Sequence, residues 1–181
     1  VYNTPFYIYD FNELLETEGL SHIVDSYLQK SFPFLSNEIL DKIENDCQND
    51  YIGKEQYYDY LTDCQFRSSI ITHTDNIKDI NISRNIKIDS IKALNYRGFY
   101  VKNEEGKYVI GEDKEVVESE KKALFLETVA KHYPNTVTVD EIEKELENKL
   151  NTVEICEILL VLVYQRKIEV YNDKLTVNKE E

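Results

Sequence analysis

The stretch Glu55-Gln56-Tyr57-Tyr58-Asp59-Tyr60-Leu61, which is followed four residues later by Phe66-Arg67, is a dense mixture of aromatic and charged side chains. An earlier stretch, Thr4-Pro5-Phe6-Tyr7-Ile8-Tyr9-Asp10-Phe11, has a similar character. A charged group among aromatic side chains needs a partner, because burying it alone is costly. We therefore expect Arg67 to pair with Asp59 or Asp10 and to tie the residues that follow the predicted helix 54–63 to that helix.

The segment 1–73 is predicted to be a mainly helical domain. Asp10 is expected to cap a helix, with Glu13 completing a capping box and Gly19 ending the helix. The three tyrosines of Glu55–Leu61 must point in different directions on a helix, so some are expected in the core and others at a surface. The other elements expected in this segment are a helix over 22–30, a helix capped by Ser36, a turn over 50–53 and a helix over 54–63.

The segment 74–119 is predicted to be a β-rich connection. Isoleucines alternate with polar residues at 80–82 and 86–88, which indicates strands. Phe99–Val101 and Tyr108–Ile110 flank a predicted hairpin turn in which Gly106 can take a left-handed backbone conformation.

The segment 120–181 is predicted to contain three helices, the second after Thr138 and the third near Asn151. A terminal hairpin formed by residues 168–171 and 175–177 is expected to follow, which is the element order of a winged helix. The expected fold class is therefore α+β, with an N-terminal helical domain, central antiparallel hairpins and a C-terminal winged-helix-like module.

The chain is strongly acidic, with 21 basic and 35 acidic residues among 181 and a formal net charge of -14. Such a surface repels nucleic-acid phosphates and anionic lipid heads, so we expect neither nucleic acid nor a membrane as a partner. A basic protein is electrostatically easier to bind. The three scattered cysteines and the absence of a secretory signal favour a cytoplasmic location.

No residue pattern in the chain carries recognisable catalytic chemistry. The five glycines are too far apart for a phosphate-binding loop, and the three histidines have no neighbours at metal-ligand spacing. We therefore expect no catalytic, cofactor-binding or metal-binding residues. The predicted third helix presents Glu154 and Glu157 early, which argues against its reading DNA.

The quoted motifs resemble the predicted methyltransferase regulatory domain of bacterial S-adenosylmethionine-dependent methyltransferases. The resemblance covers about residues 3–73 and departs mildly at Ile8, at His22-Ile23 and at Tyr60, where the family pattern has other residues. The positions that match the family motif are Pro5, Tyr7, Asp10, Phe11, Gly19, Leu20, Glu55, Gln56, Tyr57, Asp59, Phe66 and Arg67. The segment after 120 is similar to a winged-helix-like segment found in some bacterial protein-lysine methyltransferases.

The resemblance implies a catalytic domain upstream of Val1 that holds S-adenosylmethionine, and the start without methionine is interpreted as an excerpt from a longer protein. The fragment itself is then not an enzyme. The partner implied by the resemblance is its own catalytic domain, and the acidic surface favours a basic, lysine-rich protein substrate as a second partner. The roles left open are positioning the substrate, shaping access to the methyl donor, and self-association as a homodimer.

Three alternatives remain open beside this interpretation. The first is a protein-interaction adaptor with a winged-helix module and no link to methyl transfer. The second, which the acidic helices disfavour, is a DNA-binding regulator. The third is a stand-alone enzyme, which a solvent-exposed cleft of clustered polar groups would support.

Overall fold

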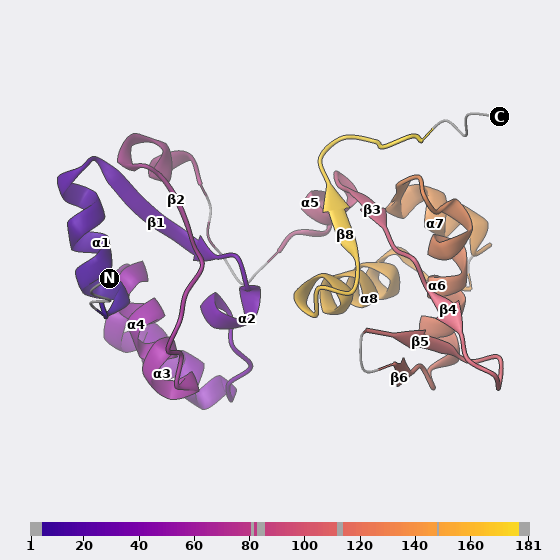
Figure 1. The fold of residues 1–181 in the computed structure, drawn as a ribbon, viewed down its shortest axis with the longest axis horizontal. Helices are drawn as coiled ribbons and strands as arrows, with labels where there is room; N and C mark the ends of the chain where they lie inside the picture. Colours follow the sequence, from indigo (N-terminus) through magenta and orange to yellow (C-terminus); the bar gives the residue numbers. More distant parts are fainter. Residues whose placement is uncertain (1–4, 81, 83–85, 112–113, 148, 178–181) are drawn as a thin grey trace. The chain divides into compact units, whose positions relative to one another are not determined.

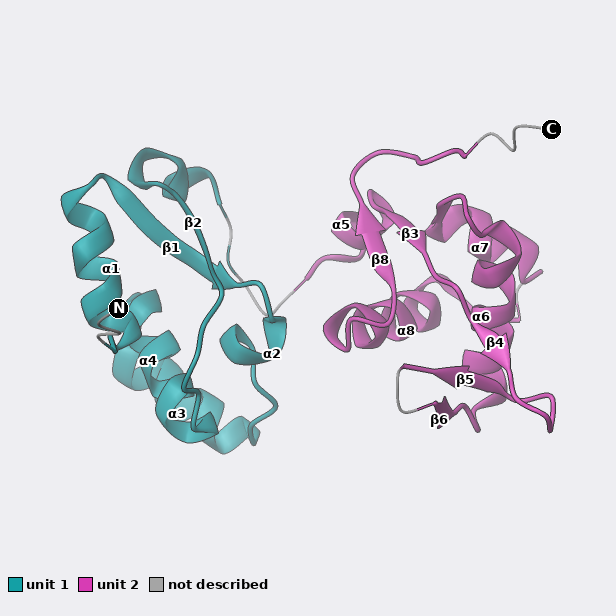
Figure 2. Ribbon diagram, in the orientation of Figure 1, with its two compact units in different colours: residues 1–84 teal, residues 85–181 magenta. Residues whose placement is uncertain are grey.

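The computed structural model describes residues 5–80, 82, 86–111, 114–147 and 149–177, so Asn3 and Thr4 of the motif lie outside it. The chain divides into two compact units, residues 1–84 and 85–181 (Figure 2). Helices combine with three small sheets in which every described strand pairing is antiparallel. This confirms the α+β class, while the expected boundaries at 73 and 119 stay predictions.

Unit 1 consists of a two-stranded sheet with four α-helices and one 3-10 helix (Figure 1). Strand β1 pairs with β2 so that Leu20 lies opposite His73 and Asp25 opposite Ser69. Helix α4 contacts α1, α2 and α3, which makes it the centre of the unit. The elements are α1 (Ile8–Thr17), β1 (Leu20–Asp25), α2 (Leu28–Ser31), α3 (Asn37–Cys47), α4 (Tyr51–Thr62), β2 (Ser69–His73) and η1 (Thr74–Asp79).

Local capping chemistry explains where two of these helices begin. The Ser36 hydroxyl accepts a hydrogen bond from the Ile39 backbone at the start of α3, as predicted. The Asp50 carboxylate accepts one from the Gly53 backbone, so Tyr51–Gly53 form the first turn of α4 and the predicted free turn at 50–53 is wrong. Gly19, at φ +68°, follows the end of α1 as expected.

Two other predictions for unit 1 are wrong. Helix α1 begins at Ile8 with Tyr7 at the N-cap, so Asp10 lies inside the first turn, where an acidic side chain is favoured by the helix dipole. The expected helix over 22–30 is replaced by β1 and the short α2. The β-branched pair Ile23-Val24 suits a strand, and the hydrogen bonds to β2, more than 40 residues later, stabilise it there.

The interior of unit 1 is unusually polar. Among the described residues of this unit, the buried apolar side chains are Ile8, Ile43 and Tyr58. Six polar residues are buried beside them: Asn12, Ser21, His22, Asp25, Ser31 and Glu55. Buried polar groups must find partners within the fold, so the structure of unit 1 depends on how these six are paired.

Unit 2 has two three-stranded sheets and a helical core. The sheet orders are β7-β3-β8 and β4-β5-β6. The elements are α5 (Ile88–Lys92), β3 (Asn95–Arg97), β4 (Val101–Lys102), β5 (Tyr108–Ile110), β6 (Glu115–Val116), α6 (Glu120–His132), β7 (Val137–Thr138), α7 (Val139–Glu145), α8 (Thr152–Tyr164) and β8 (Glu169–Tyr171).

The three predicted helices of unit 2 are present as α6, α7 and α8. Thr138 and Asn151 form capping boxes with Glu141 and Glu154 that start α7 and α8. The core of unit 2 is apolar, and its completely enclosed side chains include Phe125, Leu126, Ile142, Ile155, Leu159 and Leu162. The predicted hairpin is also present, because β4 pairs with β5 and Gly106 has φ +78°.

Two β-strand predictions fail in this half of the chain. None of the described residues of 80–88 is in a strand, and Ile88 begins α5. Position 81 of the predicted strand 80–82 lies outside the described residues. Strand β8 pairs with β3 and not with 175–177. Leu175 instead exchanges hydrogen bonds with Thr136, which precedes β7.

No described helix of either unit is long and apolar enough to cross a membrane.

Candidate functional site

A buried carboxylate, that of Glu55, is at the centre of unit 1. It lies on α4 with an exposed fraction of 0%. The Tyr51 hydroxyl, one turn earlier, donates to Glu55 Oε1 at 2.8 Å, and the Ser31 hydroxyl of α2 donates to Oε2 at 3.0 Å. A buried carboxylate with this many donors is held in one geometry.

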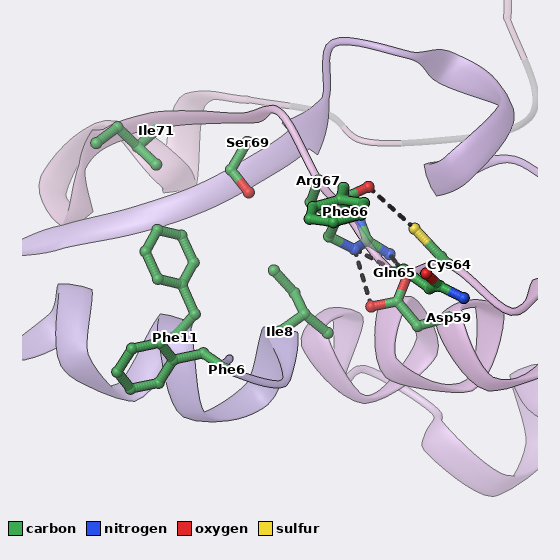
Figure 3. Close-up of a pocket in the computed structure, with 10 residues that line it drawn as sticks. All are labelled: Phe6, Ile8, Phe11, Asp59, Cys64, Gln65, Phe66, Arg67, Ser69 and Ile71. Carbon is green, nitrogen blue, oxygen red and sulfur yellow. Dashed lines mark hydrogen bonds and ion pairs between the residues drawn. The ribbon is translucent and has the colours of Figure 1, made fainter. Parts of the chain in front are cut away.

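Arg67 supplies the cation that this carboxylate needs. Its two terminal nitrogens donate to Glu55, one to Oε2 at 2.5 Å and the other to the backbone carbonyl at 3.1 Å. The Arg67 Nε lies 2.9 Å from both Oδ atoms of Asp59 (Figure 3). The predicted pairing of Arg67 with Asp59 is therefore found, whereas Asp10 is exposed and takes no part in it.

The electrostatics of this cluster favour its charged form. Burial alone would raise the pKa of Glu55, but the neighbouring His22 ring, the Arg67 charge and the Tyr51 hydroxyl together hold that pKa below its usual range. Burial alone would lower the pKa of Arg67, but the carboxylates of Asp59 and Glu55 raise it. The net effect is a raised pKa. Burial and the adjacent Glu55 raise the pKa of Tyr51, which stays a hydrogen-bond donor.

Two further buried residues of β1 surround this centre. The His22 ring stacks on Tyr51 with centroids 6.3 Å apart, and its Nε2 lies 3.9 Å from Glu55 Oε2. Neither ring nitrogen of His22 has a hydrogen-bond partner among the described residues. The Asp25 carboxylate accepts from the backbone N–H groups of Tyr27 and Ser68, both at 2.8 Å, and so joins β1 to the residues that follow Arg67.

A cavity of about 320 Å³ opens beside this cluster. Its walls combine the Asp59–Arg67 pair with apolar side chains, and Figure 3 shows them facing the space between α1 and the segment 64–71. The apolar lining residues include Phe6, Ile8, Phe11, Phe66 and Ile71. A second cavity of about 420 Å³ adjoins it and shares Phe6, Asp59, Cys64 and Gln65.

The structure brings together only part of the residues singled out from the sequence. Glu55, Asp59 and Arg67 form one network, and Phe11 and Phe66 line the first cavity. Gln56, Tyr7 and Pro5 line the second cavity. Tyr57 is exposed on α4, while Gly19 and Leu20 form the link from α1 to β1.

Sequence reasoning missed four members of the cluster: His22, Asp25, Ser31 and Tyr51. Two of them fell in a segment predicted as a helix, and Tyr51 fell in a predicted turn. The one available signal was that Tyr51 and Glu55 are four residues apart, a spacing at which side chains on a helix meet.

This arrangement is a structural network of ion pairs and hydrogen bonds, and a largely apolar cavity adjoins it. Every carboxylate oxygen of Glu55 is hydrogen-bonded, and no group of three His, Cys, Asp or Glu in the described part of the chain is placed to hold a metal ion. What the site offers a partner is therefore the surface of its two cavities.

Comparison with known proteins shows a similarity of unit 1 to a described protein family. Residues 1–73 match the family model described as predicted methyltransferase regulatory domain. A curated relative, the uncharacterized protein RP789 of Rickettsia prowazekii (strain Madrid E), is 29% identical over 96 residues, which cover 51% of this chain and 16% of the relative.

Solved structures resemble the chain over almost its whole length. PKMT2 from Rickettsia typhi in complex with AdoHcy matches with a TM-score of 0.69 and 21% identity, covering 96% of this chain and 37% of PKMT2. A second PKMT2 structure from Rickettsia typhi matches with a TM-score of 0.65, also at 21% identity, covering 96% of this chain and 38% of that one. At this identity the similarity concerns the fold.

Proposed function

We propose that the chain is the accessory region of an S-adenosylmethionine-dependent methyltransferase acting on protein lysines, because residues 1–73 match the model of the predicted methyltransferase regulatory domain. The observation that carries the proposal is that both units, and not only the family-matched segment, share a fold with PKMT2. In this proposal the region positions the substrate for a catalytic domain outside the chain and acts in the cytoplasm.

We propose that the methyl donor binds to a domain outside this chain. Binding a dinucleotide or related donor in a doubly wound fold uses parallel strands and a glycine-rich turn into a helix. Every strand pairing in the described residues is antiparallel, and the five glycines are far apart. The described residues therefore contain no strand arrangement of that kind, which supports a donor site elsewhere in the full-length protein, and no catalytic step is assigned to them.

The charge of the chain supports a basic protein substrate. With a net charge of -14, the region attracts lysine-rich segments and repels nucleic acid. The cavities beside the Asp59–Arg67 pair offer aromatic contact surface with which such a segment can be held. The region is then a substrate-positioning element whose contribution depends on ionic strength.

We also infer that residues 120–177 are a winged-helix-like module used for packing. The order α6, β7, α7, α8, β8 supports this, with β7 between the first and second helices as a winged helix has it. Strand β3 pairs with both β7 and β8 and takes the place of the missing second wing strand.

The experiment is a methyl-transfer assay on the full-length protein with labelled S-adenosylmethionine and a lysine-rich protein. We expect label on lysine, identified by mass spectrometry, and a rate that falls as salt rises. Phe66→Ser, at an exposed cavity residue, should raise the KM for the protein substrate several-fold and leave the KM for S-adenosylmethionine unchanged. The matched control is Val153→Ser on α8, also exposed. Absence of methyl transfer, or equal effects of the two variants, would refute the proposal.

A further inference from the structure

The second cavity of unit 1, at the C-terminal end of α4, combines aromatic rings with carboxylates. The residues that define it are Phe6, Tyr7, Gln56, Asp59, Tyr60 and Asp63. No lysine, arginine or histidine lines it. The first cavity differs from it because Arg67 lines the first cavity, although the two cavities share Phe6, Asp59, Cys64 and Gln65.

Three aromatic rings border this cavity from two different elements. Phe6 and Tyr7 precede α1, whereas Tyr60 lies in the last turn of α4, and the Tyr7 and Tyr60 rings meet edge to face with centroids 5.8 Å apart. All three side chains are more than half exposed although each is largely apolar. The faces of aromatic rings attract cations, most strongly cations that shed water easily.

The charges around the cavity leave an excess of negative charge. Asp59 shares the single guanidinium of Arg67 with Glu55, so one cation serves two carboxylates. Asp63 caps the C-terminus of α4 in a left-handed conformation (φ 50°), and its carboxylate has no ion pair or hydrogen bond among the described residues. The C-terminal end of a helix is itself partly negative, and α4 has no basic residue in its last turn. A cation is therefore favoured at this position.

A donor for a second contact lies in the wall of the same cavity. The Gln56 Oε1 accepts from the Tyr9 backbone at 3.4 Å, but its Nε2 is buried and has no hydrogen-bond partner among the described residues. A buried donor without an acceptor is unfavourable. Because Gln56 lines the cavity, a turn of its side chain towards the cavity would bring this donor to an occupant that presents a carbonyl oxygen, as a peptide backbone does.

We propose that the cavity between the start of α1 and the end of α4 binds the side chain of a methylated lysine in a basic peptide. The rings of Phe6, Tyr7 and Tyr60 contact the methylated ammonium, Asp63 supplies the uncompensated negative charge, and Gln56 donates to the peptide backbone. Methylated lysine is favoured over lysine because each methyl group weakens hydration and increases contact with the rings. The choice of a lysine peptide rests on the proposed function, whose product this site would retain.

The test is calorimetric binding of short basic peptides to the full-length protein. One peptide carries a central trimethyllysine, a second carries lysine and a third norleucine at that position. We expect the trimethyllysine peptide to bind roughly 3- to 30-fold more tightly than the norleucine peptide, with the lysine peptide between them. Equal affinity of all three, or tightest binding of the unmodified lysine, would overturn the inference.

Two variants locate the binding site. Tyr60→Leu keeps an apolar side chain but removes the ring, and Asp63→Asn removes an exposed charge at little risk to folding; each should abolish most of the preference for trimethyllysine. Tyr57→Leu is the matched control, since Tyr57 is exposed on the same helix but does not line this cavity. An unchanged preference in both test variants would place the binding elsewhere and contradict the proposal.

Methyl transfer measured on the same preparations separates this inference from the proposed function. Activity on lysine without selective binding of trimethyllysine refutes the cavity assignment alone. Selective binding that is lost in the two variants, in a protein without methyl-transfer activity, supports the cavity assignment and refutes the proposed function alone.

Discussion

Arg67 is hydrogen-bonded to Glu55 at two points, since one of its terminal nitrogens donates to the Glu55 carboxylate and the other to the Glu55 backbone carbonyl. The same guanidinium binds Asp59 one turn further along α4. Three groups of a single helix thus hold the segment that leads from α4 into β2. This fixes the position of Phe66 and of the cavity wall that Phe66 forms.

Replacing Arg67 by methionine is expected to destabilise unit 1 by about 3–5 kcal/mol, because the fully buried Glu55 would lose its only counter-charge among the described arginines and lysines. Hydrogen exchange of peptides from residues 5–80, measured along a urea series, reports this loss. Arg97→Met is the control: its pair with Glu169 lies at the surface and should be worth about 1 kcal/mol or less. Similar losses in the two variants would show that the Glu55 charge is not held by Arg67.

Ser31→Ala is expected to cost about 1–3 kcal/mol despite the small size of the change. The Ser31 hydroxyl accepts from the Asp25 backbone at 2.8 Å and donates to Glu55 at 3.0 Å, and both partners are completely buried. Without it a backbone N–H and a carboxylate oxygen each lose a partner. The free energy of unfolding from urea titration measures the effect. For comparison, Ser36→Ala removes an exposed helix cap and should cost about 1 kcal/mol; a smaller loss for Ser31→Ala than for Ser36→Ala would contradict the structure.

Glu141 is expected to titrate far below an ordinary glutamate. The Lys174 ammonium and the Thr138 backbone N–H, as donors to its carboxylate, lower its pKa to about 2. Because the folded pKa is below the unfolded value of about 4.3, this carboxylate stabilises the fold above that pH. The contribution is lost as the pH falls towards 2. Carboxyl ¹³C NMR titration measures the midpoint directly.

The control for that titration is Lys174→Met, which removes the largest cause of the shift while leaving the capping box in place. Its Glu141 midpoint should move up towards the ordinary value. A midpoint that is the same in both proteins would mean that Lys174 does not hold the carboxylate in solution.

Gly98→Ala is expected to destabilise unit 2 more than Gly106→Ala. A β-carbon at position 98 would lie 2.5 Å from the Tyr100 ring, which is buried and donates a hydrogen bond to the Lys167 carbonyl. At position 106 nothing lies within 4 Å, so only the cost of φ +78° for a non-glycine residue, about 1 kcal/mol, applies. Thermal unfolding of both variants measures the difference, and the reverse order would contradict the packing of Tyr100.

Predictions from local interactions were the ones that succeeded. The Ser36 cap and the starts of α7 and α8 depend on side chains within three residues of the backbone groups that they bind. The end of α1 depends on the left-handed conformation that Gly19 adopts. The Arg67–Asp59 pair could be foreseen because the two residues are eight positions apart in one dense motif.

Predictions that required a distant partner failed. Leu20–Asp25 is a strand because residues 69–73 pair with it, and β8 pairs with β3, which lies more than 70 residues earlier. Glu55 has the local surroundings of an exposed helical glutamate. Its burial involves Tyr51, one turn earlier on the same helix, together with Ser31 and Arg67, which come from two other segments.

The sequence by itself determined the helices α3, α7 and α8 with their caps and the identity of the motif, because these depend on spacing and chemistry along a few consecutive residues. Only the tertiary structure decided which charges share Arg67, which strands pair, and that Phe6, Tyr7 and Tyr60 meet around a cavity beside Asp63. The physical reason is that a buried charge or a strand edge is stabilised by whichever partner the fold brings to it, and chain position does not specify that partner.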